Sequence, residues 1–141
     1  MAEATIPSRT QRGVVLHSAE THQTVPGDQV RVRVKLERTG RGFYIGTAEV
    51  ADSPLAELQC AAQATLQALG HAVADLAPVT FELREVEVFQ AFGQGVVMVS
   101  LTVSIQGQPR DMVGFSPLVA DAATSAARAV LDSTNRLLGM G

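Results

Sequence analysis

The chain has 141 residues, of which 46% are hydrophobic and 18% are charged, and its formal net charge is −3. This balance is too apolar and too weakly charged for a disordered chain, and it lacks the excess positive charge of a general nucleic-acid binder. The only cysteine, Cys60, excludes an intramolecular disulfide and favours a reducing compartment. No secretory signal opens the chain and no apolar run reaches the ~18 residues of a membrane span, so we expect a cytoplasmic protein that contacts no membrane.

The N-terminal residues 1–12 are polar and show no periodicity, which predicts a flexible tail. A single domain is expected over residues 13–141. Its first strand is predicted from residue 13 to about residue 22, and the turn signal Pro26-Gly27-Asp28 follows it.

The next segment carries the clearest strand pattern in the chain. Four apolar residues alternate with charged ones, and they are Val30, Val32, Val34 and Leu36. A strict two-residue period predicts a strand with one buried face. A turn over 39–42 then predicts a hairpin, with a third strand over 43–50.

A helix is predicted after the third strand. Ser53 can accept hydrogen bonds at the helix N-terminus, and Pro54 suits the first helical position. The apolar residues recur at spacings of three and four, as Leu55, Leu58, Ala62, Leu66 and Leu69. Gly70 or the residues after it are expected to end the helix, because Pro78 excludes its continuation.

The second half repeats the same order. A strand over 79–92 is predicted to contain a bulge, because Phe81 and Leu83 share one face whereas Val86 and Val88 fall on the other. Further strands are expected over 97–105 and 112–119, separated by Gly-containing turns. A final helix is predicted from Asp121 to 138, with Gly139 just past its end.

The two halves also agree in detail. Gly46 and Gly114 occupy matching places in the third strand of each half, and residues 61–66 match residues 126–131 at four of six positions. We therefore predict an α+β fold of two tandem β-β-β-α units, over about 13–77 and 78–139, related by a pseudo-two-fold axis with antiparallel sheets packed on two helices. One unit alone would leave a large apolar face unburied, and any sheet face that stays open favours a symmetric partner.

The segment from Gly114-Phe115-Ser116 to Asp121, with Ala129, Leu131 and Asn135-Arg136-Leu137, resembles the end of the C-terminal regulatory domain of isopropylmalate and citramalate synthases. The resemblance implies two β-β-β-α units, dimerisation, and binding of an end-product amino acid at an interface without catalysis. It places the candidate ligand-binding residues at Gly114, Ser116 and Asp121. For Asp121 the favoured interpretation is structural, because an Asp at this position caps a helix.

A second candidate surface is the basic strand within 31–41. Arg31, Arg33 and Lys35 project from one strand face, so they are candidate residues for binding a carboxylate, a phosphate or an acidic partner. Charges on a solvated or edge strand produce the same pattern, and this interpretation is favoured.

No catalytic site, metal site or cofactor is predicted. His17, His22 and His71 lack a metal-ligand spacing, and Cys60 lies among apolar helix positions as a small core residue. Ser100, Thr102 and Ser104 form a hydroxyl strip that either lines a shallow site or faces water.

The leading hypothesis is thus a non-enzymatic regulatory or assembly module that forms a homodimer and binds a small effector such as an amino acid. An adaptor for an acidic partner and a small enzyme with a site between subunits are the alternatives.

Overall fold

A computed structural model describes residues 13–23, 28–76, 78–118 and 121–138. Its elements are β1 (Val14–Gln23), β2 (Gln29–Arg38), β3 (Gly42–Ala51), α2 (Ala56–Ala72), β4 (Val79–Ala91), β5 (Gln94–Ile105), β6 (Gln108–Pro117) and α3 (Ala122–Leu138). The predicted tail over 1–12, the Pro26-Gly27 part of the first turn and the predicted stop at Gly139 lie outside the described residues.

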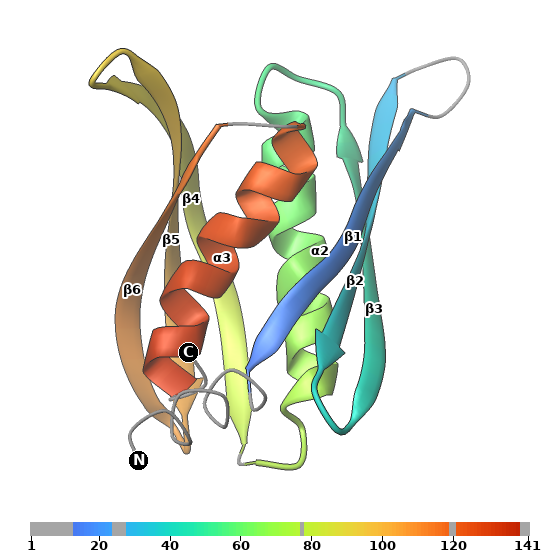
Figure 1. Cartoon of the computed structure of the whole chain (residues 1–141), viewed down its shortest axis with the longest axis vertical. Coiled ribbons are helices and arrows are strands. Elements are labelled where there is room, and N and C mark those ends of the chain that lie inside the picture. The colour runs from blue at the N-terminus through green and yellow to red at the C-terminus, as the bar shows by residue number, and fades with distance from the viewer. Residues whose placement is uncertain (1–12, 24–27, 77, 119–120, 139–141) are drawn as a thin grey trace, which may run out of the picture.

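The two helices lie between two three-stranded antiparallel sheets (Figure 1). One sheet has the order β1-β2-β3 and the other the order β4-β5-β6. Helix α2 packs on β2 and β3 of its own unit and contacts β4 of the other, while α3 packs on β5 and β6 and contacts β1. The α+β fold of two tandem β-β-β-α units is therefore as predicted.

The core lies where the inner faces of both sheets meet the helices. The central strands contribute the fully buried residues Val32, Val34, Leu36, Val97, Val99, Leu101 and Val103. The helices contribute mainly alanines, of which Ala61, Ala64, Ala68, Ala126 and Ala129 are completely buried. Small side chains let each helix lie close to its sheet and to the other helix, so both helices fit into one layer.

The bulge predicted in the fourth strand is confirmed. The β4–β5 register shifts between Leu83 and Glu85. A bulge that was not predicted lies in β1, where the β1–β2 register shifts between Leu16 and Ser18. The two bulges occupy equivalent places, because each follows a leucine paired with a leucine of the central strand: Leu16 with Leu36, and Leu83 with Leu101.

Gly46 and Gly114 make equivalent contacts in the two halves. A Cβ atom on Gly46 would overlap the carbonyl oxygen of Ala64, and a Cβ on Gly114 would overlap that of Ala129. Only glycine fits where a helix backbone lies this close to a strand. The match between the third strands that the sequence indicated thus has a physical cause in both units.

The residue after each glycine extends the equivalence. The backbone N–H of Thr47 donates to Oε1 of Gln67 at 2.7 Å, and that of Phe115 donates to Oδ2 of Asp132 at 3.1 Å. Gln67 and Asp132 occupy the same place in α2 and α3, counted from the matched alanine segments. The outer edge of each sheet is therefore tied to its helix by a side-chain acceptor.

The predicted start of the first helix is wrong. Helix α2 begins at Ala56 after Leu55, and no side chain caps it. Ser53 instead contributes its carbonyl oxygen, which accepts from the N–H of Ala56 at 3.1 Å. Leu55 packs against the core, so the chain between strand and helix follows apolar packing and the Ser53 side chain does not reach a capping position.

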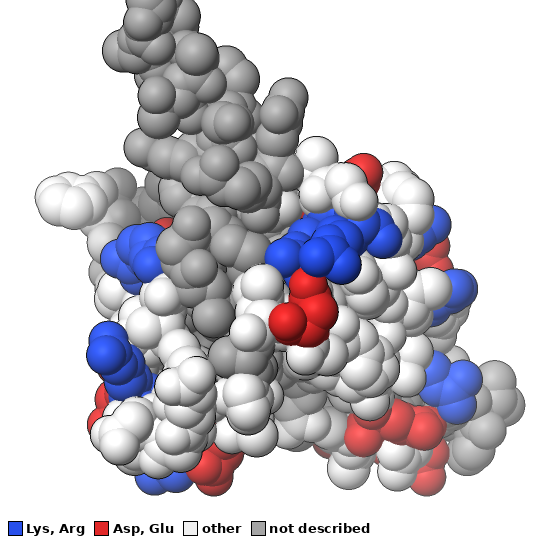
Figure 2. Space-filling model, turned by 90° about the horizontal axis from the view of Figure 1, so that it is seen from below, with Lys and Arg blue, Asp and Glu red and all other residues white. Residues whose placement is uncertain are grey.

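The other end of α2 is held by an arginine. Nη1 of Arg38 donates to the carbonyl of Ala72 at 3.0 Å and to Oδ1 of Asp75 at 2.6 Å, and Arg41 lies 2.9 Å from Oδ2 of Asp75. The hydrogen bond from Arg38 holds the pKa of Asp75 below its usual range. Figure 2 views this end of the molecule, where basic side chains gather beside acidic ones.

Candidate functional site

Two grooves lie at equivalent places, each between the helix of one unit and the first strand of the other. We call them the α2 groove and the α3 groove. The α2 groove has a volume of about 600 Å³ and is lined by Gln63, Leu66, Gln67, Gly70, His71 and Val79–Leu83. The α3 groove has a volume of about 450 Å³ and is lined by Val15, Leu16, Arg128, Leu131, Asp132, Asn135 and Arg136.

The helix residues of the two grooves correspond one to one. Counted from the matched alanine segments, the pairs are Gln63 and Arg128, Leu66 and Leu131, Gln67 and Asp132, Gly70 and Asn135, and His71 and Arg136. Because the backbone frame repeats, the chemistry of each groove is set by the side chains that differ.

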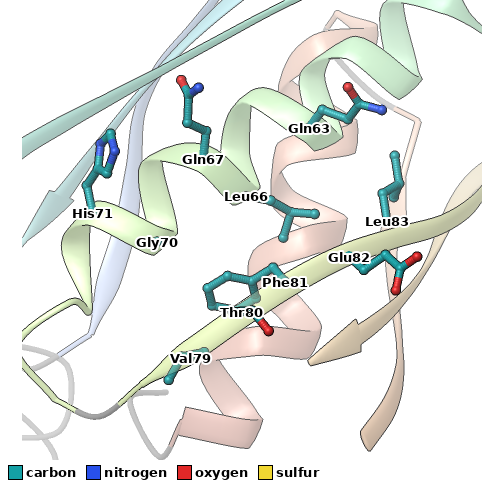
Figure 3. Close-up of a pocket in the computed structure, with 10 residues that line it drawn as sticks. All are labelled: Gln63, Leu66, Gln67, Gly70, His71, Val79, Thr80, Phe81, Glu82 and Leu83. Carbon is teal, nitrogen blue, oxygen red and sulfur yellow. The ribbon is translucent and has the colours of Figure 1, made fainter. Parts of the chain in front are cut away.

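The α2 groove has an apolar floor. Leu66 points from α2 toward Phe81 and β4, whereas Gln67 projects from the side of the helix away from β4 (Figure 3). At Gly70 no atom lies within 4 Å of the place where a Cβ would be. The groove therefore has room for an apolar side chain above a glycine.

The α3 groove combines charges of both signs with an apolar wall. Nε of Arg136 donates to the Asp132 carbonyl at 2.9 Å, its Nη2 donates to the Val113 carbonyl at 3.1 Å, and it lies 3.5 Å from Oδ2 of Asp132. The exposed Arg128 forms no ion pair within the part of the chain that the structure describes, although its charge attracts the carboxylate of Asp121. A guanidinium in this state is available to an anionic group, since it binds a carboxylate through two parallel hydrogen bonds.

Asn135 links the α3 groove to β1. Its Nδ2 donates to the carbonyl of Val14 at 3.1 Å, but its Oδ1 is buried and accepts no hydrogen bond from the described residues. The α2 groove has Gly70 at the equivalent place, and Phe81 is the equivalent of Val14. One groove thus pairs a polar helix residue with a small strand residue, and the other pairs a glycine with a large ring.

Gly114, Ser116 and Asp121 line neither groove. Gly114 touches the backbone of α3, as described above, and Ser116 is 5% exposed with its hydroxyl donating to the Pro117 carbonyl at 3.2 Å. Oδ1 of Asp121 accepts from the N–H of Thr124 at 2.7 Å, which holds the pKa of Asp121 below its usual range. In this arrangement Asp121 caps α3, the interpretation that the sequence favoured.

The basic residues of β2 lie on the outer face of its sheet. Arg31 is 3.7 Å from Glu49 on β3. Nζ of Lys35 lies 4.5 Å from the centre of the Phe43 ring, a cation–π contact, and Arg33 and Lys35 line a shallow hollow of about 340 Å³ with His17, Ser18 and Glu20. The hollow contains both signs of charge, so it is not purely an anion site.

The remaining candidate side chains contact neighbouring residues of the chain. The thiol of Cys60 donates to the Ala48 carbonyl at 2.9 Å, and burial raises its pKa. His17 contacts the Phe43 ring edge-on, and His22 lies 3.8 Å from Glu20. Thr102, in the hydroxyl strip of β5, donates to Oδ1 of Asp111 at 3.0 Å.

The His, Cys, Asp and Glu side chains of the described residues form no group of three or more placed to bind a metal. None of the helices among these residues is both long and apolar enough to cross a membrane.

Sequence reasoning missed both grooves. The alignment of residues 61–66 with 126–131 contained the signal, because it pairs Gln63 with Arg128, and its extension toward the C-terminus pairs Gly70 with Asn135. Where aligned exposed positions of the two helices differ in charge, the surfaces of the two units differ in chemistry. The helix residues alone could not indicate that the first strand of the other unit forms the second wall.

No protein-family model matches this chain, and no curated protein matches it.

Proposed function

We propose that this chain is a non-enzymatic regulatory module that forms a homodimer and binds a small effector with a carboxylate group, such as an amino acid. The effector site is the α3 groove. The observation that carries the proposal is the difference between two equivalent grooves, of which only the α3 groove has arginines beside an apolar wall.

Each part of an amino acid has a counterpart in the α3 groove. Arg128 is available to the carboxylate, and Asp132 supplies a carboxylate of opposite charge for an ammonium group. Leu131 and the aliphatic residues Val15 and Leu16 provide a surface for an apolar side chain. The resemblance to the synthase regulatory domain supports the same class of ligand.

Calorimetry and thermal-shift measurements with leucine, isoleucine and simple carboxylates test this function. Binding is expected to raise the melting temperature of the wild-type protein. Arg128→Gln, which places in the α3 groove the amide that Gln63 supplies in the α2 groove, is expected to weaken binding about 10- to 100-fold. Gln63→Ala is the matched control and is expected to leave binding unchanged. If no ligand of this class binds, or if Gln63→Ala abolishes binding and Arg128→Gln does not, the proposed site is wrong.

A second candidate function is the adaptor for an acidic partner. It is favoured by Arg33 and Lys35, which form no ion pair with any residue that the structure describes. We expect a partner captured from lysate through this face to be released by salt and lost on charge reversal at Arg33 and Lys35. Capture that is unaffected by both changes would exclude this function.

A further inference from the structure

The β4–β5 hairpin ends in a fully exposed phenylalanine. Phe92 sits in the turn with a φ of +56°, next to Gly93 with a φ of +74°, and its relative exposure is 107%. Turns with two positive φ values favour Asn, Asp and Gly, and a bulky residue there is uncommon. Neither local conformation nor packing within the chain accounts for a phenylalanine at this position.

The surroundings of Phe92 are also apolar. On the same end of this sheet Val88, Phe89 and Leu118 are 36%, 41% and 38% exposed. The hairpin reaches past the helices and bends away from them, so its tip is free to meet another molecule (Figure 1). The described parts of the equivalent β1–β2 hairpin end instead in His22, Gln23 and Asp28.

The α2 groove matches the tip in chemistry and in size. Its floor is formed by Leu66, Phe81 and Leu83, and the open space above Gly70 lies beside them (Figure 3). An aromatic ring buries about 150–250 Å² when it fills such a site. At about 600 Å³, the groove has room for a phenylalanine ring.

The positions of the tip and the groove suit a two-fold pair. Phe92 follows one end of β4, and the β4 residues of the groove, Val79–Leu83, lie at the other end. The distance between them along the strand is about 35 Å, at roughly 3.3 Å per residue. A two-fold axis across the middle of β4 reverses the strand, so the tip of each copy lies level with the groove of the other.

We propose that a second copy of this chain inserts its Phe92 into the α2 groove, and that the exchange is reciprocal. The inference rests on the homodimer of the proposed function and identifies its contact surfaces. It leaves the α3 groove, on the other helix, open to the effector.

Sedimentation equilibrium of the full chain measures the dimer dissociation constant after the Phe92 ring is removed or the groove is filled. Phe92→Ala is expected to raise the dimer dissociation constant about 30-fold, as loss of an aromatic anchor does. Gly70→Leu fills the groove from the helix side and is expected to have a similar effect, while circular dichroism checks that it stays folded. Phe43→Ala removes another half-exposed phenylalanine, on β3 of the other sheet, and is the matched control, with no change expected.

A mixing experiment gives the sharpest test. The Phe92→Ala protein has an intact groove and the Gly70→Leu protein has an intact tip, so a mixed pair has one complete contact. The mixed dimer is therefore expected to be tighter than either variant with itself.

Two results would overturn the inference in different ways. A wild-type dimer that neither variant weakens would disprove the contact and leave the homodimer standing. A wild-type protein that stays monomeric at all micromolar concentrations would remove both.

Discussion

The α2 and α3 grooves have the same backbone frame, and they differ in four of the five helix residues that line them: only Leu66 and Leu131 match. The contacts beneath the grooves do not differ in this way, since Gly46 and Gly114 each lie against the carbonyl oxygen of the equivalent helix alanine. Close backbone packing therefore sets the shape of both grooves, whereas the exposed face of each helix can change its chemistry without changing the fold. One frame thus presents a groove with an apolar floor and no arginine, and a groove with two arginines.

The largest effect is expected at the close contacts that Gly46 and Gly114 make with the helix backbones. Gly46→Ala and Gly114→Ala each force a Cβ onto a helix carbonyl, so each is expected to lower the free energy of unfolding by about 1–3 kcal/mol or more. Urea denaturation measures the change. Gly70→Ala is the matched control, because its Cβ points into open space within a helix, and it is expected to stabilise the protein by about 0.5–1 kcal/mol. A tolerated alanine at residue 46 or 114 would contradict the equivalence.

A smaller effect is expected at Gln67 and Asp132, the side-chain acceptors at the sheet edges. Gln67→Ala and Asp132→Ala each remove the acceptor for one backbone N–H, and each is expected to cost about 1 kcal/mol in the free energy of unfolding. Asp132→Asn keeps an acceptor oxygen and is expected to cost less. Hydrogen exchange at the amides of Thr47 and Phe115 should show the loss directly. If only one of these amides exchanges faster in its variant, the two helices are not attached alike.

The smallest effect is expected at the N-termini of the two helices, which differ in their capping. Only α3 has a side-chain cap among the described helix N-termini, so Asp121→Ala is expected to cost about 0.5–1 kcal/mol at neutral pH. The pKa of Asp121 is lowered in the folded state, so its stabilisation is fully present above the unfolded pKa of about 3.9 and is lost as the pH falls through the folded pKa. The difference between wild type and Asp121→Ala should therefore shrink below about pH 4.

Asp121→Asn is the control for this prediction. An asparagine can cap α3 without titrating, so its stability at neutral pH should stay close to that of the wild type. A wild-type advantage over Asp121→Ala that persists unchanged at pH 2 would show that the carboxylate charge does not matter.

The sequence by itself determined the order of the elements and their repetition. The alternation from Val30 to Leu36 reports which face of a strand is buried, and the shift of parity between Leu83 and Val86 reports a bulge, because side chains in a strand alternate strictly between faces. The matched glycines and alanine segments were visible for a similar reason, since close packing leaves few residue types that fit.

Only the tertiary structure decided where the grooves lie and which residues line them. Each groove joins a helix of one unit to a strand of the other, so Arg128 and Val15 meet although 112 residues separate them along the chain. The exposure of Phe92 and the late start of α2 at Ala56 also depend on how far the helix layer extends against the sheets. Such distances follow from the packing of whole elements, which no local pattern of residues records.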